Sequence, residues 1–210
     1  MRVFPINVTF APMDMAGTVQ LGPFETTYPE VTAVAFGLAC VWFMKKESAW
    51  AFPLGIVNVL IYIYIFFISR LYANAAINAF FFVMSVYGWY NWTRKTDGEG
   101  TIRISRCSRR EMALNLAAAV VFFIAIRWVL IRYTESPVPG WDAATTAVYM
   151  VAQWLLSRKR IENWLLWISA DSVMTVLLAW QGLWFSSFQY LVFTIIAILG
   201  YREWRAKLPV

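Results

Sequence analysis

Asp171 lies in the middle of a long apolar run that covers residues 163–180. An ionised side chain at the centre of a membrane span costs roughly 2.5 to 3.5 kcal/mol, so Asp171 is expected to face the protein interior or a wet cavity. At helical spacing it shares a face with Trp164, Trp167 and Thr175, which places an indole one turn from a carboxylate. This pairing suits the binding of a positive charge. The alternative is that Asp171 only forms a hydrogen bond between helices.

Neutral polar side chains lie at comparable depth in other apolar runs. Asn58 and Trp50 share a face of the run at 50–68, and we take this face as the counterpart of the Asp171 face. An interhelical hydrogen bond worth only about 0.6 to 2 kcal/mol would equally explain any single polar residue. Their coincidence on five runs favours a shared polar site inside a helix bundle. The remaining candidates are Asn74, Asn78, Tyr149, Gln153, Gln189 and Tyr190.

The apolar runs are the elements that must position these side chains. The chain has 210 residues, of which 60% are hydrophobic and only 14% are charged. A helix of about 20 apolar residues crosses the hydrocarbon core of a bilayer. We therefore predict an all-α membrane protein with seven transmembrane helices, at residues 30–44, 50–68, 73–92, 111–131, 142–157, 163–180 and 184–203.

Lysine and arginine residues gather on one side of the predicted spans. Short cytoplasmic loops carry an excess of positive charge, so this distribution fixes the orientation. The N-terminus is predicted outside and the C-terminus in the cytoplasm. The net charge of +6 then follows from topology, and no nucleic-acid partner is expected. Fourteen of the eighteen basic residues fall on the cytoplasmic side, and the exceptions are Arg2, Arg70, Arg132 and Arg127, the last near the end of a span.

Two parts of the chain resemble each other. The sequence Gly88-Trp89-Tyr90-Asn91-Trp92 ends one run, and Gly200-Tyr201-Arg202-Glu203-Trp204 ends another in the same pattern of glycine, aromatic residue and tryptophan. Trp50 and Trp164, each shortly after a basic run, are two positions further apart than Gly88 and Gly200. The difference predicts a two-residue slip within one loop.

The predicted spans divide into two triplets joined by one linking span. Because each triplet has an odd number of spans, the linker lets both cross the membrane in the same direction, as in one class of transporter. Trp92 and Trp204 are expected in the cytoplasmic interfacial belt, where amphipathic rings are favoured. The predicted organisation is an external segment at 1–29, a first three-helix repeat at 30–92, a cytoplasmic loop at 93–110, a linking helix at 111–131, a second repeat at 142–204 and a cytoplasmic tail at 205–210.

The sequence lacks the residues that several classes of function require. The chain has no histidine, which removes the commonest general base and metal ligand. No Gly-x-x-x-x-Gly-Lys phosphate loop occurs, and Cys40 and Cys107 have no metal-ligand spacing. We expect no catalytic residues, no metal and no cofactor. A purely structural membrane subunit stays open as an alternative, although it gives no reason for the buried polar positions.

The chain resembles the PnuC vitamin transporters, and specifically their nicotinamide riboside branch, which has the three-one-three layout of SWEET-like proteins. The resemblance covers most of the chain after residue 30. It depends on several motifs together, none of which is specific alone. They are Gly55-Ile56-Val57-Asn58-Val59, Leu71-Tyr72-Ala73, Tyr87-Gly88-Trp89-Tyr90-Asn91-Trp92, Trp141-Asp142 and Glu162-Asn163-Trp164-Leu165-Leu166-Trp167.

This resemblance implies a homotrimer in the bacterial inner membrane that carries nicotinamide riboside by facilitated diffusion, with phosphorylation in the cytosol trapping the vitamin. The flat, positively charged pyridinium ring would stack on Trp167, and Asp171 would balance its charge. The family pattern often has Asn at the position of Asp171. The ribose would bind neutral polar side chains. Transport of thiamine or riboflavin, and symport coupled to an ion bound at Asp171, remain the alternatives.

Overall fold

The computed structural model describes residues 18–21, 24–96, 100–134 and 138–208. Helices dominate these residues, because the chain is a series of apolar runs separated by short polar turns. The seven helices of the described part are α1 (Tyr28–Lys45), α2 (Ala51–Ile68), α3 (Tyr72–Thr93), α4 (Arg109–Tyr133), α5 (Pro139–Ser157), α6 (Glu162–Trp180) and α7 (Trp184–Ala206).

Each predicted membrane span falls on one of these helices. Among the described residues, α2, α4 and α6 are long and apolar enough to cross a membrane by length and composition alone. The apolar part of α1 is shorter and covers Val31–Lys45. Helix α3 contains Asn74, Asn78 and Asn91, and such polar side chains lower its mean hydropathy. Length and composition therefore identify only some of the seven described helices as membrane spans.

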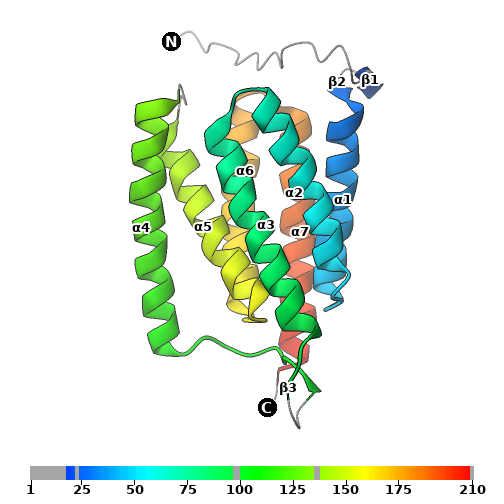
Figure 1. Cartoon of the computed structure of the whole chain (residues 1–210), viewed down its shortest axis with the longest axis vertical. Coiled ribbons are helices and arrows are strands. Elements are labelled where there is room, and N and C mark those ends of the chain that lie inside the picture. The colour runs from blue at the N-terminus through cyan, green and yellow to red at the C-terminus, as the bar shows by residue number, and fades with distance from the viewer. Residues whose placement is uncertain (1–17, 22–23, 97–99, 135–137, 209–210) are drawn as a thin grey trace.

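Six helices form a closed ring, with α4 outside it (Figure 1). Helices α1, α2 and α3 pack in chain order as a first triplet, and α5, α6 and α7 pack in chain order as a second triplet. The triplets meet along two seams, α3 against α5 and α1 against α7. Helix α4 packs on α5 at the edge of the molecule. Most of its apolar residues are exposed, as expected for a surface that contacts lipid.

Short strands flank the bundle, which departs from the expectation of a purely α-helical chain. Strand β1 (Thr18–Leu21) pairs antiparallel with β2 (Phe24–Thr27) just before α1. Strand β3 (Lys95–Thr96) pairs with β4 (Gly100–Thr101) between α3 and α4. Parts of the predicted external segment, residues 1–17 and 22–23, lie outside the described residues, as do residues 97–99 at the centre of the predicted polar loop.

Helices α1, α3, α5 and α7 finish at one end of the bundle (Figure 1). We call it the basic end, because Lys45, Arg94, Arg158 and Lys207 lie at the ends of these four helices. Glu47 accepts from Lys159 at 2.7 Å and from Lys207 at 3.1 Å. The chain before α4 also packs on this end, since Ser105 exchanges backbone hydrogen bonds with Lys159 and Ile161. The predicted cytoplasmic loop is thus partly a packed segment of the bundle.

Equivalent positions of the two triplets have the same backbone geometry at the turns. Glu47 and Lys159, whose separation of 112 positions we call the repeat offset, both have positive φ, at 61° and 51°. Arg70 and Gly182 are related by the same offset, and both have positive φ, at 60° and 79°. Only one of these four positions is glycine, although glycine adopts this conformation most readily. The two halves of the bundle therefore use one turn geometry encoded by different residues.

Four aromatic side chains form a buried layer near the basic end, here called the aromatic layer: Phe52, Trp92, Trp164 and Trp204. Phe52 packs edge-on against Trp92 at a centroid distance of 5.0 Å, and Trp164 packs edge-on against Trp204 at 5.4 Å. Trp92 and Trp204 meet between the triplets at 5.8 Å. Gly88 and Gly200 lie directly against Phe52 and Trp164, where a Cβ atom would clash with the ring. The edge-on ring pair and the glycine contact therefore both recur at the repeat offset.

This layer corrects two expectations from the sequence. The counterpart of Trp164 is Phe52 rather than Trp50, so the predicted two-residue slip is wrong. Trp50 precedes α2 and is 70% exposed. Trp92 and Trp204 are 3% and 0% exposed, so they belong to the core rather than to an interfacial belt. A tryptophan at a helix end can lie in either environment, and only packing between helices decides which.

Candidate functional site

Asp171 lies inside the bundle, on the face of α6 that meets α5. Its side chain is 4% exposed, and its Oδ1 accepts a hydrogen bond from the Tyr149 hydroxyl at 2.8 Å. The Tyr149 ring also packs against the Trp167 ring, with centroids 5.1 Å apart. One tyrosine from α5 therefore contacts both the carboxylate and the indole that the sequence places one turn apart on α6.

Tyr190 of α7 lies within electrostatic range of Asp171. Its hydroxyl interacts electrostatically with Asp171 and with Tyr62 of α2. Its ring packs edge-on against Phe193 at 6.1 Å. We call Tyr149, Trp167, Asp171 and Tyr190 the polar group. It combines a carboxylate, two phenol hydroxyls and an indole face, which suit a ligand that is flat, cationic and rich in hydroxyls.

Gln153 lies one turn along α5 from Tyr149, on the same face. It is 5% exposed, and its Nε2 donates to Ser85 Oγ of α3 at 3.4 Å. Ser85 is 4% exposed and was not selected from the sequence. A signal for it existed, because Ser85 stands two helical turns from Asn78 and so shares its face. Gln153 and Ser85 extend polar character from the polar group to the seam between α3 and α5.

Other predicted site residues occupy different places. Asn58 donates to the Ala33 carbonyl of α1 at 2.7 Å, and Asn78 donates to the Asn74 carbonyl within α3 at 3.0 Å. Both amide nitrogens are thus engaged with backbone. Gln189 is partly exposed on α7. Trp50 lies at the basic end, at the start of α2, and the structure does not bring it to the polar group.

The polar group belongs wholly to the second triplet. At the repeat offset, Tyr149 corresponds to Gly37, Trp167 to Gly55 and Asp171 to Val59. Asn58 is therefore not the counterpart of Asp171, contrary to the expectation from the sequence. At these three positions the first triplet has small or apolar side chains, whereas Tyr190 corresponds to a polar residue, Asn78. The two halves share a backbone plan, but their contributions to a ligand site differ.

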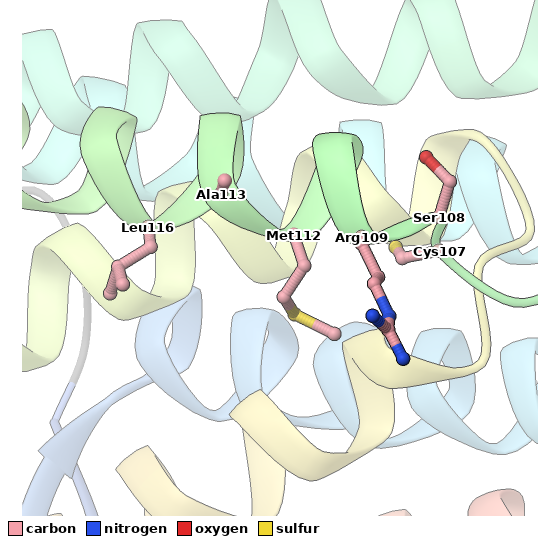
Figure 2. A pocket seen from close by; sticks show the side chains of 6 residues that line it. All are labelled: Cys107, Ser108, Arg109, Met112, Ala113 and Leu116. Carbon is pink, nitrogen blue, oxygen red and sulfur yellow. The ribbon is translucent and has the colours of Figure 1, made fainter.

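A separate shallow pocket of about 370 Å³ lies beside the first turns of α4. Figure 2 shows Arg109 and Met112 along this helix, together with Cys107 just before it. Burial, followed by the nearby Glu162 carboxylate, raises the pKa of the Cys107 thiol to about 12. A protonated thiol is a poor nucleophile and a poor metal ligand. Among the described residues, no group of three or more side chains is suited to hold a metal ion.

A helix bundle in which α2, α4 and α6 are long and apolar enough to cross a membrane is typical of a membrane protein, and the polar group inside it suits the passage or binding of a small polar molecule. The chain belongs to the nicotinamide mononucleotide transporter family, whose sequence model matches residues 27–206.

Individual relatives are transporters. The chain is 29% identical to the nicotinamide riboside transporter PnuC of Escherichia coli, and the match covers 87% of each chain. It is 27% identical to the riboflavin/roseoflavin transporter RibM of Streptomyces davaonensis, over 76% of each chain. A crystal structure of the vitamin B3 transporter PnuC has the same fold, with a TM-score of 0.67 at 23% identity, covering 85% of this chain and 81% of that one.

Proposed function

We propose that this protein carries nicotinamide riboside across the bacterial inner membrane. The observation that supports this substrate is the contact of Tyr149 with both Asp171 and Trp167. A pyridinium ring can stack on the indole while its positive charge lies near the carboxylate. The nicotinamide riboside transporters among the relatives favour the same substrate.

Neutral partners for the ribose are available around this cation site. Tyr149 and Tyr190 provide hydroxyls from two different helices, and Gln153 and Gln189 provide amides. Because a hydroxyl both donates and accepts, tyrosine can pair with either atom of a sugar hydroxyl. We therefore assign the substrate site to the interior face of α5, α6 and α7, with Trp167 and Asp171 contacting the ring.

The proposed topology has seven membrane spans arranged as two parallel three-helix repeats joined by α4. The matched turns at Glu47 and Lys159 and the matched aromatic pairs of the aromatic layer support this internal repeat. The basic end would lie in the cytoplasm, by the distribution of lysine and arginine. The N-terminus would then lie outside, and the protein would assemble as a homotrimer.

The proposed mode of transport is facilitated diffusion by alternating access, with phosphorylation in the cytosol trapping the vitamin. The similarity to a riboflavin/roseoflavin transporter favours riboflavin as a second candidate substrate. Coupling to an ion is a second candidate mode, because Asp171 has no basic partner among the described residues.

Uptake into proteoliposomes tests both parts of the proposal. Purified protein should bind nicotinamide riboside more tightly than thiamine or riboflavin in a titration against all three vitamins. Labelled nicotinamide riboside should then equilibrate across the vesicle membrane with or without a proton or sodium gradient. Accumulation above the outside concentration, following an imposed gradient, would contradict facilitated diffusion. Tighter binding of riboflavin would contradict the substrate assignment.

A further inference from the structure

The lack of a cationic partner for Asp171, in the part of the chain that the structure describes, indicates which ligands the protein selects. This inference rests on the proposed function. Within the described residues the ion pairs lie at the basic end, and none includes Asp171. Its Oδ1 is engaged by the Tyr149 hydroxyl, whereas Oδ2 has no hydrogen bond in this part of the chain. A buried carboxylate without a cation is costly, so a cationic ligand gains from occupying this place.

We propose that Asp171 is a specificity-determining residue that selects ligands carrying a fixed positive charge, and that Tyr149 is its positioning residue. Oxidised nicotinamide riboside has a cationic pyridinium ring. Its 1,4-dihydro form has nearly the same shape but a neutral ring, so it gains nothing from the carboxylate and less from the face of Trp167. The protein should therefore distinguish the two redox forms of one nucleoside.

Binding titrations with both redox forms test this selection. Wild-type protein should bind the oxidised form at least about tenfold more tightly than the dihydro form. Asp171→Asn should reduce that ratio to about twofold or less, because the amide is nearly isosteric but neutral. Tyr149→Phe should lower the ratio by a smaller factor. The Asp171 charge remains in this variant, but its carboxylate is no longer held by the Tyr149 hydroxyl.

The ratio of the two affinities distinguishes a loss of charge selection from a general loss of binding. A purely structural role of Asp171 or Tyr149 would weaken both redox forms in parallel and leave the ratio unchanged, which would overturn the proposal. Equal binding of the two forms by the wild type would overturn it as well. Failure of the proposed function looks different, because neither form would then bind.

A second and independent observation concerns the two seams between the triplets. In the described residues, four hydrogen bonds cross the α3/α5 seam. Each involves at least one buried residue, and two of them end on the helix carbonyls of Leu156 and Ser157. The other two bonds are Gln153 Nε2 to Ser85 Oγ and Ser157 Oγ to the Met84 carbonyl.

The α1/α7 seam has a different chemistry at the matching positions. Val41 and Ala197 stand where Gln153 and Ser85 stand in the other seam. The indole N–H of Trp204 has no hydrogen-bond partner in the described residues, whereas that of its counterpart Trp92 donates to the Leu156 carbonyl at 3.2 Å. The polar contacts of the α1/α7 seam are ion pairs at the basic end. Glu203, whose side chain is 33% exposed, pairs with the buried Lys45 at 2.9 Å and with the exposed Lys46 at 3.6 Å, and Lys207 pairs with Glu47 at 3.1 Å.

We infer that the α1/α7 seam parts during the proposed transport cycle, while the α3/α5 seam acts as the hinge. Separating α3 from α5 would break the four hydrogen bonds between described residues and leave the buried indole N–H of Trp92 and the buried amide of Gln153 without acceptors, which is expensive. Separating α1 from α7 exchanges apolar contacts along most of the seam, and the ion pairs that it breaks lie at the end of the bundle, where Glu203 is already 33% exposed. The fold thus makes one seam weaker than its counterpart.

Cross-linking at matched positions tests this inference. In a background with Cys40→Ala and Cys107→Ala, one variant carries Lys45→Cys with Glu203→Cys, and the control carries Asn91→Cys with Ser157→Cys. The control pair lies at the same two places of the other seam, as the repeat offset relates them. A short, reducible bifunctional thiosulfonate should lower uptake at least about tenfold in the first variant and less than about twofold in the control, and reduction should restore uptake.

Uptake before cross-linking reports on the proposed function alone. Equal inhibition of the two pairs, or inhibition of the control pair only, would overturn the assignment of the moving seam. Thiol labelling gives a measurement that does not need transport. Met44→Cys should react at least about threefold faster than its counterpart Leu156→Cys, since both side chains are buried and only an opening seam exposes one of them. Equal labelling rates would overturn the inference.

Discussion

Glu47 and Lys159 occupy the same place in the two helix triplets and bind each other directly. They are 112 residues apart, both have positive φ, and Lys159 Nζ lies 2.7 Å from Glu47 Oε1. Lys159 also lies over the Trp92 ring, at 4.7 Å from its centroid. This ion pair joins the turn between α1 and α2 to the turn between α5 and α6, just outside the aromatic layer.

Loss of the Glu47 carboxylate should destabilise the protein. The Lys159 side chain is 5% exposed, so Glu47→Gln leaves a buried ammonium group without its partner. We expect a loss of about 2 to 3 kcal/mol, at or just below the range for a fully buried pair, because Glu47 is partly exposed. Unfolding in detergent measures this loss. Lys207→Gln is the control, with an effect of less than about 1 kcal/mol at its exposed end of the same network. Equal effects of the two variants would contradict the prediction.

The same ion pair predicts a dependence of stability on pH. Burial raises the pKa of Glu47, but the hydrogen bonds and charges of Lys159 and Lys207 outweigh burial, so the pKa lies below its usual value of 4.5. A lowered pKa contributes stability that is present above the unfolded value and lost as pH falls through the folded value. The difference in Tm between wild type and Glu47→Gln should therefore shrink as pH falls below 4.5. A constant difference would show that the Glu47 charge does not contribute.

Gly88 and Gly200 should tolerate no larger side chain. A Cβ atom at Gly200 would lie 2.7 Å from the Trp164 ring, and one at Gly88 would clash with Phe52. We expect Gly88→Ala and Gly200→Ala each to cost about 1 to 3 kcal/mol of unfolding free energy. Gly140→Ala is the control, because nothing lies within 4 Å of its added methyl group. A partial recovery in Gly88→Ala with Phe52→Leu would confirm the cause, whereas unchanged stability of both single variants would refute it.

Loss of the indole N–H should destabilise the protein more at Trp92 than at Trp204. Trp92 Nε1 donates to the Leu156 carbonyl, whereas Trp204 Nε1 has no partner in the described part of the chain. Replacement by phenylalanine removes the indole N–H in both cases. We therefore expect Trp92→Phe to cost about 0.5 to 1.5 kcal/mol more than Trp204→Phe in unfolding experiments. A larger cost for Trp204→Phe would indicate that its indole N–H is satisfied in the membrane.

Removal of the Trp167 indole should weaken substrate binding. The ring packs against Tyr149 next to Asp171, where we place the pyridinium ring. Trp167→Ala should weaken nicotinamide riboside binding at least about tenfold, or about 1.4 kcal/mol. Trp180→Ala on the same helix is the control, because its side chain is 71% exposed at the far end of α6. Unchanged affinity of Trp167→Ala would rule out stacking on this ring.

The sequence by itself determined the helices and the burial of Asp171. Apolar runs and turn residues set the limits of each helix, and a lone acid inside such a run has no favourable place except the interior. The closeness of Trp167 to Asp171 also followed directly, because both lie on one face of one helix. These features depend on local periodicity and solvation, which a linear sequence contains.

Contacts between helices were decided only by the tertiary structure. The sequence could not show that Tyr149 of α5 reaches Asp171, nor that Phe52 rather than Trp50 is the counterpart of Trp164. It also placed Trp92 at the membrane surface, although packing buries it against Trp204. The physical reason is that an apolar or amphipathic side chain is equally compatible with lipid and with a neighbouring helix. Only the register between helices selects one of these environments.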